Sequence, residues 1–367
     1  MSPLIPIMDT SRLLEDEKLA IQREIERVHK SSMYIKGPAV YEFEESFAAF
    51  HGEGFKCVGV GNGEDGLVLA LKALDLRPGG EVLVPSNDGG FAALACRISG
   101  LVPVVVDVSL DSGLITEETL TSGLSNQTVA VIATHLHGSM VDIARVKEFC
   151  DIHSLLLIED CSQAHGASDF GIKVGTTGDV ATYSHYPTKN LGAFGDAGSV
   201  VTRDSKIAKR IRQLSNYGWE EKYSIGIQGG QNSRLDSIQA AVLKAKLPFL
   251  DRNNKLRAGI LQKYQLNIKH GRLLIPSSNV SVAHHAVLIT KSREQIIQRL
   301  NESEISWDIH YPLVVQKMAG LALDRQRETP NADQLTREQI SLPCFPTLEP
   351  REVDFVVSVI NRGLGSQ

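Results

Sequence analysis

The run Leu155-Leu156-Leu157-Ile158-Glu159-Asp160 joins four consecutive apolar residues to two carboxylates. A short apolar run of this kind is typical of a strand that is buried on both faces of a parallel sheet. In α/β proteins, ligands bind at the edge formed by the carboxyl ends of such strands. The run therefore predicts an α/β fold and places Asp160 at a candidate binding edge.

Further strand-like runs occur on both sides of this one, and helical stretches separate most of them. These runs lie at residues 57–61, 81–85, 102–108, 128–134, 180–186 and 199–202. Alternation of strands and helices implies right-handed crossovers and a mostly parallel sheet with helices on both faces. Counting the first run, we predict a large doubly wound sheet of seven strands.

Helical patterns outside this sheet suggest how the rest of the chain is organised. They lie at residues 13–28, 41–50, about 235–264, 293–300 and 351–361. In the second of them, Phe43, Phe47 and Phe50 share one face. We predict a large domain at residues 1–250, including N-terminal helices, and a smaller C-terminal α/β domain at residues 251–367.

Composition narrows the classes of function. Hydrophobic residues make up 42% of the 367 residues and charged residues 22%, with a net charge of −5, as in ordinary globular proteins. No basic cluster suggests a nucleic-acid partner, and no run approaches the roughly 20 apolar residues of a membrane span. The five cysteines are odd in number and lack paired metal spacing, which favours reduced thiols. We expect a cytoplasmic protein with no membrane, nucleic-acid or metal partner.

Lys189 is the best candidate for a reactive lysine. It lies in a polar, glycine-flanked turn directly after the strand-like run 180–186. A lysine at a strand end that is partly shielded from water can lose its proton near neutral pH and attack a carbonyl group. Most lysines are simply surface residues. Asp160, at the end of an earlier strand, strengthens the catalytic interpretation.

The glycine-rich stretch 59–66 follows the first predicted strand and precedes a helix at residues 67–74. Exposed backbone N–H groups at such a helix start can bind a phosphate. An ordinary tight strand-to-helix turn is the alternative. A dinucleotide site is disfavoured because Pro85 and Ser86 stand where an acidic ribose partner would follow the second strand.

A phosphate cradle, an acid and a lysine at strand ends together match the needs of pyridoxal phosphate. The lysine holds the cofactor aldehyde as a Schiff base, and the carboxylate keeps the pyridine nitrogen protonated. Lys189 and Asp160 suit these two roles.

Several motifs in order make the chain resemble the DegT/DnrJ/StrS family of pyridoxal-phosphate-dependent nucleotide-sugar aminotransferases. The resemblance covers nearly the whole chain. Its motifs lie at residues 34–38, 61–65, 84–86, 159–166, 184–192, 232–241, 310–312 and 342–343.

The resemblance implies a fold-type I, aspartate-aminotransferase-like enzyme that works as a homodimer with shared active sites. Lys189 would be the Schiff-base lysine and Asp160 the partner of the pyridine nitrogen, with Gln163 near the ring or its phenolate oxygen. Contacts to the phosphate are expected from Asn62, Gly63, the backbone of Glu64, Ser184 and, across the dimer, Asn232. Weaker candidates for substrate contacts are Phe91, His135, Arg234, His310 and Tyr311.

The activity implied by the resemblance is transfer of an amino group, from L-glutamate, to a nucleotide-linked deoxy keto sugar in amino-sugar or polysaccharide biosynthesis. The keto group would be at carbon 3 or 4, and the nucleotide dTDP or UDP. One alternative is a catalytically silent or regulatory protein on the same scaffold. Another is a related sugar dehydratase, which Lys189 disfavours because those enzymes carry histidine there.

Three positions depart from the family pattern or have a second interpretation. Gly89 stands where an aromatic ring usually stacks on the cofactor, so Phe91 or His135 would have to cover the ring, unless Phe91 is a core residue. Glu64 replaces a common threonine, and its carboxylate must point outward to avoid repelling a phosphate. Asn232, or Ser233 beside it, is also a candidate helix N-cap, with Arg234 solvated.

Overall fold

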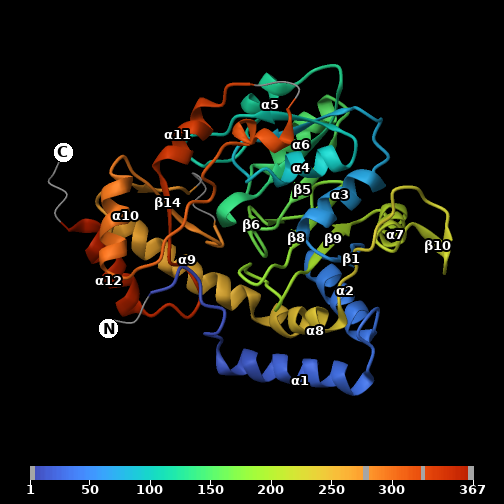
Figure 1. Ribbon diagram of the computed structural model, residues 1–367, viewed down its shortest axis with the longest axis horizontal. Helices are drawn as coiled ribbons and strands as arrows, with labels where there is room; N and C mark the ends of the chain where they lie inside the picture. The colour runs from blue at the N-terminus through green and yellow to red at the C-terminus, as the bar shows by residue number, and fades with distance from the viewer. Residues whose placement is uncertain (1–4, 276–280, 324–326, 363–367) are drawn as a thin grey trace.

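The computed structural model describes residues 5–275, 281–323 and 327–362, and its centre is a seven-stranded sheet (Figure 1). The strand order is β1-β9-β8-β5-β4-β2-β3. The strands are β1 (Lys56–Val60), β2 (Glu81–Pro85), β3 (Val102–Val106), β4 (Thr128–Thr134), β5 (Leu156–Asp160), β8 (Val180–Ser184) and β9 (Gly198–Thr202). All seven predicted strands are confirmed, with ends that differ by at most two residues.

The sheet is parallel from β8 through β5, β4 and β2 to β3, whereas β9 runs antiparallel to both β8 and β1. The register pairs Thr134 with Asp160 and Asp160 with Thr182, which aligns the carboxyl ends of three strands. An antiparallel partner needs no crossover helix. The β8–β9 connection therefore stays at the carboxyl edge of the sheet, and Lys189 lies within it.

Helices cover both faces of the sheet, as predicted. The α-helices of the described residues, some of which belong to the C-terminal part, are α1 (Glu15–Ser31), α2 (Pro38–His51), α3 (Gly63–Ala73), α4 (Phe91–Ile98), α5 (Glu117–Gly123), α6 (Ile143–Ile152), α7 (Ser205–Leu214), α8 (Ser237–Lys246), α9 (Leu250–Asn267), α10 (Arg293–Glu302), α11 (Pro330–Glu338) and α12 (Pro350–Asn361). Successive strand residues point to opposite faces. Accordingly Leu157 packs in the cluster that includes α2, α5 and α6, whereas Ile158 packs in the cluster with α3 and α4.

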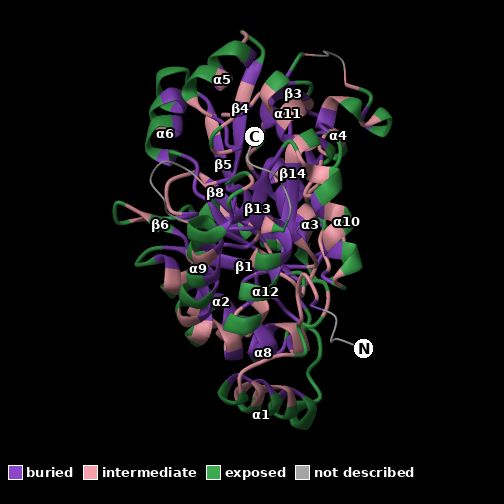
Figure 2. Ribbon diagram, turned by 90° about the vertical axis from the view of Figure 1, so that its left-hand side faces the viewer, coloured by how far each residue is buried: buried purple, intermediate pink, exposed green. Residues whose placement is uncertain are grey.

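The sheet forms the buried centre of the molecule, coloured purple in Figure 2. β2 and β3 are rich in valine, a β-branched residue that packs well on a pleated surface. At the N-terminus, α1 packs against α8 (Figure 1). Phe43 and Phe47 of α2 are fully buried, and Phe50 packs against the same cluster, as the helical pattern predicts.

The C-terminal part has its own antiparallel sheet, β12 (Arg272–Leu273), β13 (Ala286–Ile289) and β14 (Gln339–Leu342). With α9, α10 and α12 it encloses a separate hydrophobic cluster, which confirms its predicted α/β character. Ile5 belongs to this cluster and pairs with Ile305. The N-terminal segment therefore packs with the C-terminal part, and the division at residue 250 stays a prediction.

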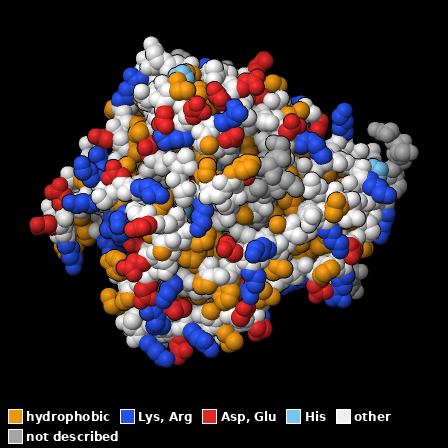
Figure 3. Space-filling model, turned by 180° about the vertical axis from the view of Figure 1, so that it is seen from behind, with side chains coloured by type: hydrophobic (Ala, Val, Ile, Leu, Met, Phe, Trp, Pro, Cys, Tyr) orange, Lys and Arg blue, Asp and Glu red, His pale blue; other side chains and the backbone are white. Residues whose placement is uncertain are grey.

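Surface and thiol properties agree with an ordinary globular protein. All five cysteines are free and buried. On the face shown in Figure 3, positive and negative side chains are interspersed and form no continuous basic patch. Among the described residues, no helix combines the length and apolar character that crossing a bilayer requires.

Candidate active site

A cavity of about 440 Å³ opens at the carboxyl edge of β4, β5 and β8. It brings together most of the residues that the sequence marks as candidates. Those in its wall are Asn62, Gly63, Glu64, Phe91, Asp160, Gln163, Ser184, Lys189, His310 and Tyr311. We call this the cofactor cavity.

Lys189 lies in a turn of the β8–β9 connection, where its backbone N–H donates to Tyr186 O at 2.8 Å. Burial lowers the pKa of Lys189 to about 8, although the Asp160 carboxylate opposes this shift. At pH 7 about one Lys189 side chain in ten is therefore an uncharged amine, far more than for a lysine with the ordinary pKa of 10.5. This is the state in which a lysine attacks a carbonyl carbon.

Hydrogen bonds that the sequence did not reveal hold the lysine turn in place. The ring of buried His185 contacts Leu191 O at 3.0 Å and Ser199 Oγ at 2.9 Å. Next to the lysine, Asn190 donates to Val282 O at 2.9 Å and Asn254 Oδ1 at 2.8 Å. The turn is therefore tied both to the main sheet and to the C-terminal part.

Asp160 is the last residue of β5 and is 5% exposed. One of its carboxylate oxygens accepts a hydrogen bond from Ser162 N at 3.1 Å. Ser162 Oγ in turn accepts from Ser184 N at 3.0 Å. The ends of β5 and β8 are therefore joined beside the cavity, and Asp160 has remaining acceptor capacity for a protonated ligand nitrogen.

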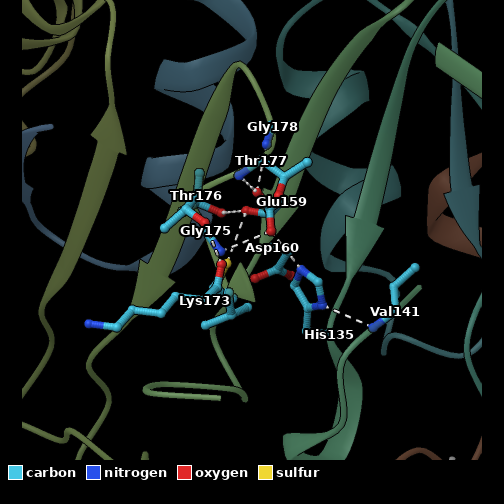
Figure 4. Close-up of polar contacts among 12 residues, drawn as sticks. His135, Val141, Glu159, Asp160, Lys173, Gly175, Thr176, Thr177 and Gly178 are labelled. Atoms are coloured by element: carbon cyan, nitrogen blue, oxygen red, sulfur yellow. Dashed lines mark hydrogen bonds and ion pairs between the residues drawn. The ribbon is translucent and has the colours of Figure 1, made fainter. Parts of the chain in front are cut away.

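Glu159 lies on the other face of β5, where its buried carboxylate makes several polar contacts (Figure 4). It accepts backbone hydrogen bonds from Gly175, Thr177 and Gly178 at 2.7–2.9 Å, and His135 Nε2 lies 3.0 Å from its carboxylate. Burial by itself would raise the pKa of Glu159, but these contacts outweigh it and lower the pKa. The buried Glu159 carboxylate thus holds the His135 ring in its position.

The structure contradicts the suggestion that His135 covers the cofactor ring. Its side chain is fully buried and is held by Glu159 on one side and by Val141 N, at 3.1 Å, on the other. It does not line the cofactor cavity. Both ring nitrogens of His135 are used in these structural contacts, whereas the preceding residue, Thr134, lines the cavity.

The start of α3 forms an anion cradle. Asn62 caps the helix, with its Oδ1 accepting from Asp65 N at 2.8 Å. Among the described residues, no acceptor contacts the backbone N–H of Gly63 or Glu64, as expected for the first turn of a helix. A Cβ atom on Gly63 would lie 2.6 Å from Ser184 Cβ, so glycine permits this close approach. Phosphate can thus meet two N–H groups and a hydroxyl.

Two aromatic rings lie near the position where the family pattern has a single one. Gly89 adopts a φ of +82°, and a Cβ atom there would lie 3.0 Å from the Phe91 ring and 3.1 Å from the Tyr311 ring. The two rings meet edge to face, with centroids 6.0 Å apart. Phe91 is 45% exposed, so its interpretation as a core residue is wrong.

Gln163 links this aromatic wall to the end of β4. Its Nε2 donates to Tyr311 Oη at 2.9 Å, and its Oε1 accepts from His137 N at 2.8 Å. Burial raises the pKa of Tyr311, so its phenol stays protonated. The position of Gln163 in the cavity wall agrees with its expected place near the cofactor ring, which stays a prediction.

Three residues of the cavity wall, His284, His285 and Asp88, were not predicted as site residues. His284 and His285 join His310 there, and His285 stacks on His310 with centroids 3.8 Å apart. Burial lowers the pKa of all three, so these histidines are uncharged at neutral pH. Asp88 is also buried in this wall, where burial raises its pKa to about 7. The sequence Asp88-Gly89-Gly90 directly before α4 could have revealed this residue. An aspartate at such a position can accept hydrogen bonds from the following backbone, as Asp88 does from Gly90 N and Ala92 N.

Asn232 and Arg234 lie outside the cofactor cavity of their own chain. Asn232 is exposed, and Arg234 contacts Asn216 Oδ1 at 3.4 Å. The helix-cap interpretation is wrong because α8 begins at Ser237, five residues after Asn232, and its N-cap residue is Asp236. Ser233 instead accepts from Gly61 N at 2.9 Å, which braces the loop before α3. The expected role of Asn232 across a dimer stays a prediction.

These features fit pyridoxal phosphate. The free N–H groups and the Ser184 hydroxyl match its phosphate, Asp160 matches its ring nitrogen, and Lys189 matches its aldehyde. The three groups lie around one cavity, so a single ligand can reach all of them.

Comparisons with known proteins agree with this site. A profile of the DegT/DnrJ/EryC1/StrS aminotransferase family matches residues 15–361. The chain is 37% identical over 362 residues to a dTDP-3-amino-3,6-dideoxy-alpha-D-galactopyranose transaminase from Aneurinibacillus thermoaerophilus, covering 98% of this chain and 99% of the relative.

Solved structures give the same result. The crystal structure of S. venezuelae DesV with a ketimine intermediate is 35% identical and has a TM-score of 0.93, covering 98% of each chain. The structure of NtdA from Bacillus subtilis with bound cofactor PMP is 25% identical and has a TM-score of 0.89, covering 97% of this chain and 84% of the other. The predicted aminotransferase-like fold is therefore confirmed, and the chain belongs to the DegT/DnrJ/EryC1/StrS aminotransferase family.

Proposed function

We propose that this aminotransferase uses pyridoxal phosphate to move an amino group from L-glutamate to a keto group of a nucleotide-linked deoxy sugar. The observation that carries the proposal is the convergence of Lys189, Asp160 and the free N–H groups of α3 on one cavity. A silent scaffold has no need of a lysine whose pKa burial lowers to about 8.

The residues of the chain divide the work as follows. When bound, pyridoxal phosphate supplies an electron sink for the carbon that bears the amino group. The Gly63 and Glu64 N–H groups and the Ser184 hydroxyl hold the phosphate, and Asp160 keeps the ring nitrogen protonated. The Lys189 amine takes up and returns the proton at the reacting carbon. Glu64 is only partly buried, which leaves room for its carboxylate to face solvent.

The acceptor is assigned to nucleotide-linked keto sugars because a 37% identical relative is named as a transaminase of a dTDP-linked amino sugar. The Phe91 and Tyr311 rings and the uncharged histidines offer stacking surfaces and neutral hydrogen-bonding groups to a sugar. Substrate trials must decide between carbon 3 and carbon 4, and between dTDP and UDP.

A homodimer with shared sites is part of the proposal. Asn232 and Arg234 lie away from the cavity of their own chain, beside a hairpin that projects from the molecule, β10 (Trp219–Glu221) and β11 (Ser224–Ile225) (Figure 1). On this hairpin Tyr223 is 78% exposed and Ile225 is 69% exposed. Exposed apolar side chains of this kind favour a partner surface. A cytoplasmic location is also proposed, because all five thiols are free.

The test begins with visible absorbance. The protein is purified with pyridoxal phosphate and its spectrum is recorded before and after addition of glutamate alone. We expect a yellow band that glutamate removes and that a keto-sugar nucleotide then restores. A panel of dTDP- and UDP-linked 3-keto and 4-keto sugars identifies the acceptor.

Lys189→Ala is the control, since it lacks the amine that the yellow band requires. A wild-type protein that forms no yellow band would favour the regulatory alternative. A band that glutamate leaves unchanged would contradict the assigned donor but not the cofactor.

A further inference from the structure

A second cavity, of about 410 Å³, adjoins the cofactor cavity, and Lys189 lines both. The N-terminal segment 8–13, the turn after Lys189 and residues of α8 and α9 form its wall. Two cations face it, the partly buried Lys246 and the buried Arg257. We call this cavity the cation pocket.

Neither cation forms an ion pair within the part of the chain that the structure describes. Lys246 donates only to Gly192 O, at 2.6 Å, and Arg257 donates to Cys344 O with a longer contact to Met8 Sδ at 3.7 Å. Among the described residues, no carboxylate lies within ion-pair distance of either one. Arg257 is 4% exposed and its Nε has no hydrogen-bond partner. Burial of an uncompensated cation costs several kcal/mol, so an anionic ligand would be strongly stabilised here.

The acidic residues of the same wall are already engaged. Glu17 accepts from Asn253 Nδ2 at 2.9 Å and lies 3.5 Å from Arg252. Asp9 is paired with Arg12 at 3.2 Å. Glu17 therefore offsets the charge of Lys246 only in part, and the Asp9 carboxylate is engaged by Arg12. The cation pocket is therefore electropositive despite the acidic net charge of the chain.

The pKa values support this view. Burial lowers the pKa of Lys246 to about 8, with Glu17 opposing the shift, and burial lowers the pKa of Arg257 as well. In both cases loss of water is the largest cause. A bound anion would restore the interaction energy that the charged forms lose on burial.

We propose that the cation pocket binds a carboxylate group of the amino donor through Lys246 and Arg257. The proposal rests on the proposed function, because it assigns the donor side of that reaction. Lys189 lines both cavities, so a dicarboxylic amino acid can have its amino group beside the cofactor and a carboxylate beside the cations. A planar guanidinium and an ammonium group together match carboxylate geometry. Selection of an acidic donor over neutral amino acids follows.

Binding is tested without turnover. Glutarate, which has two carboxylates but no amino or keto group, is titrated calorimetrically into the full-length protein loaded with cofactor. We expect Lys246→Met and Arg257→Met each to weaken glutarate binding at least tenfold. Lys255→Met is the matched control, because Lys255 is exposed on the same helix as Arg257. Lys246→Arg, which retains the charge, is expected to bind more tightly than Lys246→Met.

Two results would overturn the proposal. Folded Lys246→Met protein that binds glutarate as tightly as wild type would overturn the proposal, and this variant suffices if Arg257→Met does not fold. Displacement of glutarate by inorganic phosphate at comparable concentration would also overturn it, since the pocket would then be a general anion site.

A second measurement separates this proposal from the proposed function. The half-saturating glutamate concentration for the change in cofactor absorbance should rise in Lys246→Met, with an unchanged limiting rate and an unchanged KM for the sugar. Wild-type protein that binds glutarate but aminates no keto sugar would leave the cation pocket standing and reject the acceptor. Wild-type protein that aminates a keto sugar, together with Lys246→Met and Arg257→Met variants that bind glutarate normally, would support the proposed function and reject the cation pocket as the donor site.

Discussion

The cofactor cavity and the cation pocket meet at Lys189 but are built from different kinds of sequence. Residues at neighbouring strand ends supply much of the cofactor cavity, and its motifs are short. The cation pocket combines segment 8–13 with Lys246, Arg257 and Thr347, which lie far apart along the chain. Chemistry at a strand end leaves a local signal, whereas a pocket between distant segments does not.

The largest expected effect comes from the residue that the two cavities share. Lys189→Ala should lower turnover by about 10⁴-fold or more, because it removes both the amine that holds the cofactor and the proton carrier. Fold and dimer should be retained, as judged by circular dichroism and sedimentation. Measurable transamination by this variant would show that Lys189 is neither the lysine that holds the cofactor nor the proton carrier.

Asp160→Asn affects only the cofactor cavity. The amide cannot keep the ring nitrogen protonated, so kcat should fall by about 10²- to 10³-fold, the scale for loss of one preorganised electrostatic contact. Affinity for glutarate should stay at the wild-type value, measured by calorimetry. A parallel loss of glutarate binding would show that the two cavities are not independent.

Gly63→Ala tests the close approach that forms the phosphate cradle. The new Cβ would lie 2.6 Å from Ser184 Cβ, so α3 or β8 must shift. We expect a loss of about 1–3 kcal/mol in the free energy of unfolding and weaker cofactor binding. Denaturant unfolding and spectral titration measure the two effects.

Gly259→Ala is the control for Gly63→Ala, because nothing lies within 4 Å of a Cβ atom at this position in α9. It should stabilise the helix by up to about 1 kcal/mol. Equal effects of the two substitutions would argue against a special role for the cradle.

The smallest expected effect is a shift of a pH midpoint. The rate of cofactor uptake by the apoprotein should rise with pH, with a midpoint near 8, because the protonated Lys189 amine cannot attack the aldehyde. Asp160 raises the pKa of Lys189, so Asp160→Asn should move the midpoint to lower pH. Stopped-flow absorbance gives this profile. A midpoint near the ordinary lysine value of 10.5 would contradict the shielding of this lysine.

The site residues that could be predicted from the sequence are those that lie at or directly after the end of a strand. The lysine, the acid and the helix start each follow a strand, and the register of that strand determines where they lie. His135 shows the limit of this reasoning. It also follows a strand, yet Glu159 engages its ring away from the cavity, and nothing in the sequence gave the partner of either residue.

The sequence by itself determined the α/β fold and the order of strands and helices, and it led to the proposal that Lys189 and Asp160 serve the cofactor. Periodicity and strand-end position are local properties, and this explains their success. Only the tertiary structure decided that Phe91 and Tyr311 meet beside Gly89, that the three cavity histidines are uncharged, and that Lys246 and Arg257 form no ion pair with any described residue. These outcomes depend on burial and on contacts between residues far apart in the chain, which no local pattern records.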